Sequence, residues 1–171
     1  TSRLVGSEMC IRDRNNGVQF KSETDTEVIV NSISYYSNTY SIEESIQKTL
    51  ENCSGTWAVI IMCINKQNTL YLSRHGSPLL LSYNENSAII TSEQSGFQNI
   101  VNNYIVLENH DIIKLSLVNN KINFINQMKN INYKKKNVTK IDDLNLDNSL
   151  FSHWTLKEIY EQSDSIRRAL S

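Results

Sequence analysis

The stretch Trp57-Ala58-Val59-Ile60-Ile61-Met62-Cys63-Ile64 decides the fold class. It is continuously apolar and rich in β-branched side chains, and it lies between Gly55 and the polar Asn65. A membrane-spanning helix needs about 20 apolar residues, so this run is too short to be one. A short apolar run between turn residues is typical of a strand that is covered on both faces. We therefore predict a buried strand over residues 57–64.

The sequence after this run predicts a series of further strands. Residues 65–68 are a polar turn, and strands are expected at 69–73, 77–83, 88–91, 104–107, 111–118 and 121–125. Asn119-Asn120 predicts a tight hairpin before the last of these strands, because Asn tolerates the positive φ that such turns require. Residues 129–148 are rich in Lys, Asn and Asp with little periodicity, which is typical of a surface connection.

Two helices are predicted before the apolar run. Thr24 and Glu27 have the spacing of a capping box, in which Thr24 accepts a bond from the first turn and Glu27 reaches back. Ser41 and Glu44 repeat this pattern. The apolar residues at helical spacing are Val28, Ile29, Ile33 and Tyr36 in the first helix and Ile42, Ile46 and Leu50 in the second. Terminal helices are expected at 154–161 and 165–170, so the order of elements favours an α+β layered domain.

The composition excludes several classes of protein. The chain has 171 residues and a net charge of −1, which opposes binding to nucleic acid or to an anionic membrane. The three cysteines, Cys10, Cys53 and Cys63, are odd in number and lack CxxC spacing, so a disulfide scaffold or zinc knuckle is not expected. A reducing compartment fits this cysteine usage best.

Few residues suggest chemistry on their own. His75, His110 and His153 are far apart in sequence, so we expect surface or interface histidines rather than metal ligands. Cys53 and Cys63 lie in or beside apolar stretches, where burial raises the pKa of a thiol and makes it a poor nucleophile. No glycine-rich phosphate loop is present. The residues therefore predict no metal, no cofactor and no catalytic side chain.

Asp25 is the most informative polar residue. A carboxylate in the first turn of a helix is stabilised by exposed N–H groups and stays ionised. From this chemistry alone, a helix-start acid without a ligand is the favoured interpretation. Cys10 follows Met9 as in an N-terminal nucleophile, but it lies in a foreign-looking segment and is not predicted to be catalytic. Residues 1–14 resemble adaptor-derived read-through and are left out of the fold prediction.

Several motifs in order along the chain resemble the glutaminase half of the glutamine–fructose-6-phosphate aminotransferases, which are also called glucosamine-6-phosphate synthases. These motifs are Phe20-Lys21-Ser22-Glu23-Thr24-Asp25-Thr26-Glu27-Val28-Ile29, Arg74-His75-Gly76-Ser77-Pro78-Leu79, Thr91-Ser92-Glu93-Gln94, Tyr104-Ile105-Val106-Leu107-Glu108 with Asp111-Ile112, and His153-Trp154-Thr155-Leu156-Lys157-Glu158-Ile159-Tyr160-Glu161-Gln162. The last motif is the most specific, since other class II amidotransferases lack it.

This resemblance implies an N-terminal-nucleophile hydrolase fold, an αββα sandwich of two sheets between helix layers. Residues 15–171 would form part of a type 2 glutamine amidotransferase domain, incomplete at its N-terminal end and ending at the junction to an absent sugar-isomerase domain. The family's left-handed turns use Gly where this chain has Asn84 and Asn86, and Asn109 lies in another such turn. We expect Asn to replace Gly in these turns.

The resemblance also implies a function. The family transfers the amide nitrogen of glutamine to fructose 6-phosphate, which gives glucosamine 6-phosphate and glutamate. Asp25 matches the carboxylate that binds the α-ammonium group of glutamine, and a charge-assisted contact there is physically sensible. The family's N-terminal cysteine, its oxyanion segment and its carboxylate-binding loop have no counterparts here, so this chain alone is predicted to be inactive.

The resemblance further implies a cytoplasmic enzyme without a cofactor, bound to neither nucleic acid nor membrane. Glutamine is the expected partner of this part, fructose 6-phosphate would bind the absent domain, and the parent would be a homodimer through that domain. Two alternatives remain. One is another class II amidotransferase, of the asparagine synthetase or amidophosphoribosyltransferase type, although these usually carry a longer loop than Arg74–Pro78. The other is a non-catalytic binding domain. His110 and Ser163 depart from the family's usual Gly and Pro.

Overall fold

The computed structural model describes residues 21–22, 24–97, 100–128, 132–138, 152–153, 155–157, 159–162 and 166. Asp25 is described by its backbone alone. The chain divides into two compact units, Thr1–Val138 and Thr139–Ser171, and each is treated by itself. The predictions for residues 1–14, including Cys10, and for Ser163 lie outside the described residues.

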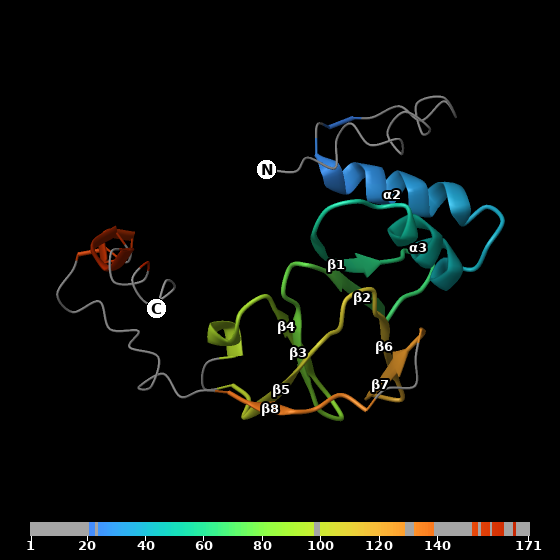
Figure 1. Ribbon diagram of the computed structural model, residues 1–171. Helices are drawn as coiled ribbons and strands as arrows, with labels where there is room; N and C mark the ends of the chain where they lie inside the picture. Colours follow the sequence, from blue (N-terminus) through green and yellow to red (C-terminus); the bar gives the residue numbers. More distant parts are fainter. Residues whose placement is uncertain are drawn as a thin grey trace. The chain divides into compact units, whose positions relative to one another are not determined.

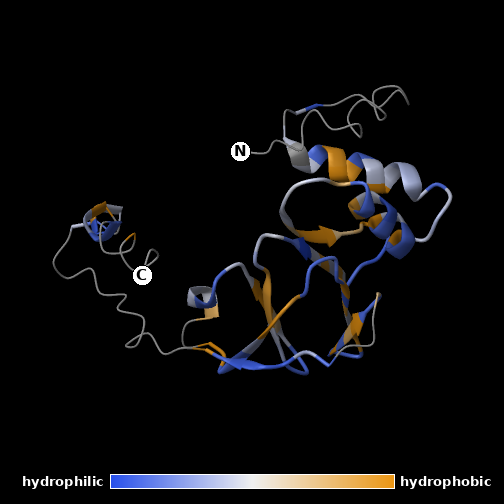
Figure 2. Ribbon diagram, viewed as in Figure 1, coloured by the Kyte–Doolittle hydropathy of each residue, from blue (hydrophilic) through white to orange (hydrophobic). Residues whose placement is uncertain are grey.

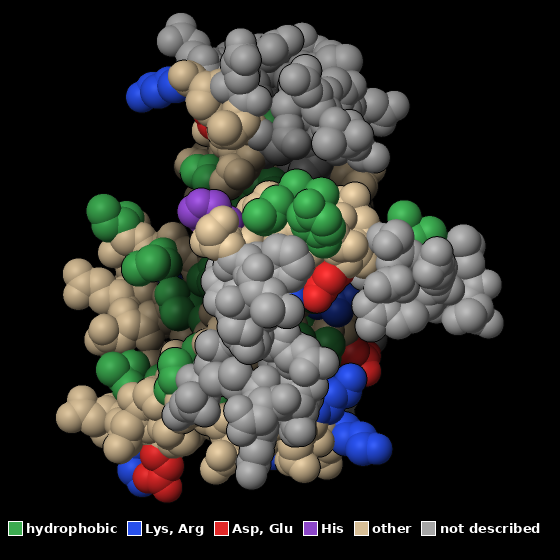
Figure 3. Space-filling view, turned by 90° about the vertical axis from the view of Figure 1, so that its left-hand side faces the viewer, with side chains coloured by type: hydrophobic (Ala, Val, Ile, Leu, Met, Phe, Trp, Pro, Cys, Tyr) green, Lys and Arg blue, Asp and Glu red, His purple; other side chains and the backbone are tan. Residues whose placement is uncertain are grey.

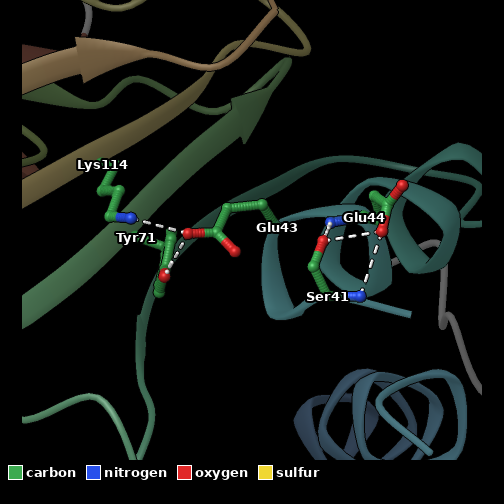
Figure 4. Close-up of polar contacts among 5 residues, drawn as sticks. All are labelled: Ser41, Glu43, Glu44, Tyr71 and Lys114. Carbon is green, nitrogen blue, oxygen red and sulfur yellow. Dashed lines mark hydrogen bonds and ion pairs between the residues drawn. The ribbon is translucent and has the colours of Figure 1, made fainter. Parts of the chain in front are cut away.

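Two helices begin the described part of the first unit, and they are capped differently. In α3 (Ile42–Glu51), Ser41 Oγ accepts from the backbone N–H of Glu44, and the Glu44 carboxylate accepts from that of Ser41, as predicted (Figure 4). In α2 (Asp25–Tyr36), Thr24 makes no side-chain cap bond, so that prediction was wrong. The Glu27 carboxylate instead accepts from the backbone N–H of Lys21 at 2.7 Å and of Ser22 at 2.6 Å. Ser22 Oγ also contacts Thr24 Oγ1, so the Thr24 hydroxyl is engaged away from the helix.

The strands form two antiparallel sheets (Figure 1). The first sheet has the order β1-β2-β6-β7, with β1 (Trp57–Met62), β2 (Thr69–His75), β6 (Ile112–Val118) and β7 (Lys121–Asn126). The second has the order β4-β3-β5-β8, with β3 (Leu80–Tyr83), β4 (Ala88–Thr91), β5 (Asn103–Val106) and β8 (Lys136–Asn137). A short 3-10 helix, η1 (Gln94–Phe97), follows β4 and was not predicted. The predicted strands are all found, with ends shifted by a few residues, and β3 begins after Pro78.

The core lies in two layers because side chains alternate along β2 and β6. Tyr71 and Ile112 face the helices, whereas Leu72 and Ile113 face the second sheet. The first cluster contains Ile29, Ile33, Ile46, Leu50, Trp57, Tyr71 and Ile112. The second contains Leu72, Leu79, Leu81, Ile105, Leu107, Ile113 and Leu115. Helices, first sheet and second sheet therefore stack in that order. Figure 2 shows that hydrophobic residues lie in the helices and in the strands of both sheets.

Strand β1 differs from the prediction. Its side chains alternate, so Trp57 is 5% exposed while Ile60 and Met62 are 50% and 79% exposed. Ile60 pairs with Leu72 and therefore points to the side of the second sheet, yet it lies outside the cluster between the sheets. The prediction of a strand covered on both faces was wrong, because only the helix-facing side of β1 is covered. An apolar sequence predicts a strand, but it does not show whether the second sheet extends far enough to cover that strand.

The turns confirm some of the expected left-handed residues and not others. Asn119 and Asn120 have φ values of 51° and 58°, which confirms the tight hairpin between β6 and β7. Neither Asn84 nor Asn86 has a positive φ, so that expectation was wrong. Asn84 instead shapes its turn through its side chain, whose Oδ1 accepts from the backbone N–H of Asn86 and of Ser87, each at 2.8 Å.

In the second unit, residues 155–157 and 159–162 are helical, in agreement with the predicted helix over 154–161. Of the predicted helix over 165–170, only residue 166 is described, and it is helical. Within the described parts of the chain, no helix has both the length and the apolar character needed to span a membrane.

Candidate functional site

Asp25 is the first residue of α2, where the sequence places it. The neighbouring acid of that turn, Glu27, is held by the backbone N–H groups of Lys21 and Ser22 and by Ser22 Oγ. The side-chain bond from Ser22, followed by the bond from the Lys21 backbone, lowers the pKa of Glu27 below its ordinary value. Glu27 is thus ionised, and its carboxylate holds the backbone of Lys21 and Ser22 against the first turn of α2. Its carboxylate is engaged by the chain itself.

The structure brings two of the family-like motifs together. Arg74, the first residue of one motif, is the last residue but one of β2, and Asn109 lies in the turn before β6. Asn109 Oδ1 accepts from Arg74 Nη2 at 2.6 Å and from the backbone N–H of Gly76 at 3.1 Å. The backbone N–H of His110 returns a bond to the Arg74 carbonyl at 2.8 Å. The residues 74–79 and 107–111 therefore form one connected junction between the two sheets.

Gly76 is required at this junction for two reasons. Its φ is +71°, in the left-handed region that favours glycine. A Cβ atom at this position would lie 2.5 Å from Thr56 Cγ2, closer than non-bonded carbon atoms approach. The glycine of the motif is thus explained by packing against the loop before β1.

His75 and His110 lie together, which the sequence did not reveal. Their ring centroids are 4.2 Å apart, and the His75 ring is 4.8 Å from that of Trp57. This contact was not predicted from the sequence. The cause is the pairing of β2 with β6, since Ser73 opposite Ile112 places the ends of these strands side by side. A prediction that strand 69–73 pairs with strand 111–118 would have placed His75 beside His110, because each histidine lies just outside the paired residues. No cluster of three or more metal-ligating side chains occurs among the described residues.

A second polar cluster ties α3 to the first sheet (Figure 4). Glu43 Oε1 accepts from Tyr71 Oη at 2.8 Å and from Lys114 Nζ at 2.7 Å. Burial opposes the charge of Glu43, but the hydrogen bond from Lys114 and further bonds outweigh it and lower the pKa of Glu43 to about 2. Burial, together with the bond to Glu43, raises the pKa of Tyr71. Glu43 is therefore ionised through the physiological pH range, and its carboxylate ties Tyr71 of β2 and Lys114 of β6 to α3.

A groove of about 870 Å³ runs between α2 and β1. Its lining includes Thr26 in the first turn of α2, the apolar face of that helix at Ile29, Val30 and Ile33, and the whole of β1 after Trp57. Glu43 lies at its side and is already paired with Lys114. The first turn that holds Asp25 is therefore adjacent to an open and largely apolar groove.

Cys53 and Cys63 are the free cysteines among the described residues. Burial raises the pKa of the Cys53 thiol to about 11, so it is a poor nucleophile, as expected from its position. Cys63 is half-buried at the end of β1. On the face that Figure 3 shows, the described charged side chains of both signs are dispersed, and they form no continuous basic patch there.

Three curated relatives resemble the chain over most of its length, and each is named glutamine–fructose-6-phosphate aminotransferase [isomerizing]. The protein from Staphylococcus aureus strain Mu50 is 30% identical over 155 residues, which is 90% of this chain and 26% of the relative. That from Geobacillus kaustophilus is 29% identical over 95% of this chain and 27% of the relative. That from Buchnera aphidicola is 31% identical over 92% and 26%. The chain spans about a quarter of the length of these relatives.

A solved structure shares the fold. The glutamine phosphoribosylpyrophosphate amidotransferase from Bacillus subtilis, in complex with ADP and GMP, superposes with a TM-score of 0.58 over 73% of this chain and 27% of its own. Its sequence identity is 19%, so the likeness concerns the fold alone. It confirms the α+β fold of the N-terminal-nucleophile type. A family model described as "Glutamine amidotransferase domain" matches residues 8–99.

Proposed function

Because the chain belongs to the glutamine amidotransferase domain family, we propose that it is part of an enzyme that transfers the amide nitrogen of glutamine to fructose 6-phosphate. The products of that reaction are glucosamine 6-phosphate and glutamate. The match to relatives that carry this activity in their names, over nine-tenths of the chain, is the observation that supports the proposal most strongly.

The junction between the motifs supports the same assignment. Arg74, Gly76 and Asn109 are joined by hydrogen bonds, and Gly76 has a positive φ. Two of the motifs that carry the resemblance are therefore in contact in the structure, at the junction of residues 74–79 and 107–111. The amidophosphoribosyltransferase alternative is supported only by a likeness of fold at 19% identity.

We assign glutamine binding to Asp25. The residue begins α2, where the positive end of the helix dipole stabilises a carboxylate in its ionised form. An ionised carboxylate is the natural partner of the α-ammonium group of glutamine. Glu27, the other acid of the turn, is engaged by Lys21 and Ser22, which leaves Asp25 as the acid assigned to the ligand.

The chain by itself is proposed to be catalytically inactive. Glutamine hydrolysis by this family requires a nucleophilic cysteine and an oxyanion site, and the motifs of both are absent from residues 15–171. The proposed enzyme is cytoplasmic and uses glutamine and fructose 6-phosphate, with the sugar bound by a part not represented in this sequence. The parent enzyme is proposed to be a homodimer through that part.

A chimera tests the function. The region of the Staphylococcus aureus relative that matches this chain is replaced by the matching 155 residues, and glutamine-dependent formation of glucosamine 6-phosphate is measured. The proposal predicts an active chimera and an inactive isolated chain. Isomerisation of the sugar without glutamine is the control for correct folding of the rest of the enzyme. A chimera that isomerises the sugar but makes no glucosamine 6-phosphate would contradict the proposal.

A further inference from the structure

Residues 127–138 form a connection that leads from β7 to the second unit. Lys134, Lys135 and Lys136 in it are exposed, as expected for a surface segment. Its strand β8 is two residues long and pairs with β5, beside which it lies in Figure 1. So short an edge strand gives a weak attachment by itself. The hold of the first unit on the connection therefore depends on other contacts.

Tyr133 supplies such a contact. Its hydroxyl donates to Asp111 Oδ2 and accepts from Asn126 Nδ2 at 2.6 Å. Its ring packs edge-on against Phe124, with the ring centroids 5.6 Å apart. Burial, followed by the bond to Asp111, raises the pKa of Tyr133, so the hydroxyl keeps its proton and remains a donor. One side chain thus ties the connection to the core between the two sheets.

The acceptor of this bond is a buried carboxylate. Asp111 is 0% exposed and directly precedes β6. Besides the bond from Tyr133, its carboxylate accepts from the backbone N–H of Glu108 at 2.9 Å and from Asn126 Nδ2 at 3.2 Å. All three donors are neutral, and a buried carboxylate is costly unless its hydrogen bonds are made. Loss of one donor should therefore loosen the whole turn 108–111.

The same turn holds the junction between the family-like motifs. Asn109 Oδ1 accepts from Arg74 Nη2 and from the backbone N–H of Gly76, and the backbone N–H of His110 donates to the Arg74 carbonyl. The last residue of turn 108–111 thus contacts the connection, and its middle residues contact the junction. The connection and the junction therefore share one short piece of chain.

We propose that Tyr133 is a positioning residue that couples the connection to the junction, acting through Asp111 and the turn 108–111. While the Tyr133 hydroxyl is bound, the turn is fixed and Asn109 is held against Arg74. When the connection leaves, Asp111 loses a donor, the turn loosens and the junction opens more often. Opening of the junction also loosens the connection, because coupling between two sites is reciprocal. This inference does not rest on the proposed function.

The coupling reaches beyond the first unit. The second unit follows the connection directly in sequence. A change that pulls on the second unit therefore has a route to the motifs of the first, through Tyr133 and the turn. The contacts along this route are hydrogen bonds that can be broken one at a time, so the coupling can be measured in single variants.

Hydrogen exchange of the full chain, followed by NMR, tests the coupling in Tyr133→Phe, which removes the hydroxyl and keeps the ring. The backbone N–H groups of Glu108, His110 and Gly76 should exchange roughly tenfold faster, the effect expected for loss of a hydrogen bond to a charged group. The N–H of Leu117, at the other end of β6, should exchange as in the wild type.

Tyr83→Phe is the matched control. Tyr83 belongs to the same aromatic stack, with its ring centroid 5.0 Å from that of Phe124. Within the described part of the chain its hydroxyl has no hydrogen-bond partner, in contrast to that of Tyr133. This variant should therefore exchange like the wild type at all four N–H groups.

Limited proteolysis tests the reciprocal direction. Trypsin cleaves after the lysines of 134–136 when the connection is released from the first unit, and mass spectrometry identifies the bonds that are cut. Asn109→Ala frees the turn from the junction and should raise this cleavage rate, as should Tyr133→Phe. Tyr83→Phe should leave the rate unchanged.

Each other outcome would overturn the proposal. Faster cleavage in Tyr133→Phe with unchanged exchange at Gly76 and His110 would show an anchor without coupling. Unchanged exchange and cleavage in Tyr133→Phe would show that the hydroxyl holds nothing, and unchanged cleavage in Asn109→Ala would show that the coupling is not reciprocal. Equal effects of Tyr83→Phe, or equal acceleration at Leu117, would indicate general destabilisation in place of a local link.

Discussion

At the scale of single residues, the structure depends on a few side chains that join distant segments. Glu43 links α3 to β2 and β6 through Tyr71 and Lys114. A surface ion pair such as Lys121 with Glu85 lacks this arrangement, because both of its side chains are largely exposed. The two pairs therefore allow buried and exposed charges to be compared in one molecule.

Glu43→Gln should destabilise the fold at pH 7. The substitution leaves Lys114 without its carboxylate in a partly buried site, and we expect a loss of about 1–3 kcal/mol in the free energy of unfolding. Urea denaturation at one fixed protein concentration measures this change. Glu85→Gln is the control and should change the stability by less than about 1 kcal/mol. Equal effects of the two substitutions would contradict this role of Glu43.

The same comparison depends on pH in a defined direction. The pKa of Glu43 is about 2 in the folded chain, below its ordinary value of 4.5. The charged form is therefore favoured by folding, so its contribution is full above about pH 4.5 and is lost as the pH falls toward 2. The difference in stability between wild type and Glu43→Gln should shrink from pH 5 to pH 3. A constant difference over this range would show that the charge is not responsible.

Gly76→Ala should be more harmful than Gly55→Ala. Both glycines have positive φ, but a Cβ at Gly76 would meet Thr56 Cγ2 at 2.5 Å, whereas one at Gly55 meets nothing within 4 Å. The Gly55 variant therefore bears backbone strain alone, expected to cost about 1 kcal/mol, and the Gly76 variant adds a steric clash. Thermal unfolding of both variants measures the difference. A Gly55 variant that is equally destabilised or more so would be inconsistent with this packing.

At the scale of secondary structure elements, α2 and α3 begin with the same sequence pattern and use it differently. Ser41 and Glu44 form the reciprocal capping box of α3. Thr24 makes no cap bond in α2, where Glu27 reaches further back to Lys21 and Ser22. The spacing of a hydroxyl and an acid thus indicates where a helix begins, but the preceding chain determines which bonds form.

Ser41→Ala should therefore cost more than Thr24→Ala. Loss of the Ser41 hydroxyl removes the bond accepted from the backbone N–H of Glu44, with an expected loss of about 1 kcal/mol in the free energy of unfolding. Thr24→Ala removes only a contact with the Ser22 hydroxyl and should cost less than half as much. Denaturant unfolding of the two variants distinguishes them. The reverse order would contradict the assigned caps.

Local patterns predicted the elements well, and their contacts poorly. Two predictions that depend on neighbours in sequence were confirmed. One is the set of buried residues at helical spacing, Ile29 and Ile33 in α2 and Ile46 in α3, and the other is the Asn119-Asn120 turn. The exposed face of β1 and the contact of His75 with His110 depend on where a facing layer ends and on which strands pair. These long-range relations leave no trace in the periodicity of a single segment.

At the scale of the whole molecule, the first unit is a helix layer and two sheets, and two of the family-like motifs meet at one junction between the sheets. The position of Asp25 at the start of α2 was predicted from the sequence, and its role as a glutamine ligand stays a prediction.

The most direct measurement is the Michaelis constant for glutamine in the Staphylococcus aureus chimera that carries Asp25→Asn. Loss of a charge-assisted bond to the α-ammonium group should raise this constant roughly 10- to 100-fold, while sugar isomerisation is unchanged. Glu51→Gln, an exposed carboxylate at the end of α3, is the matched control and should leave the constant unaltered. An Asp25→Asn chimera that binds and uses glutamine as well as its parent would contradict the assignment of this residue.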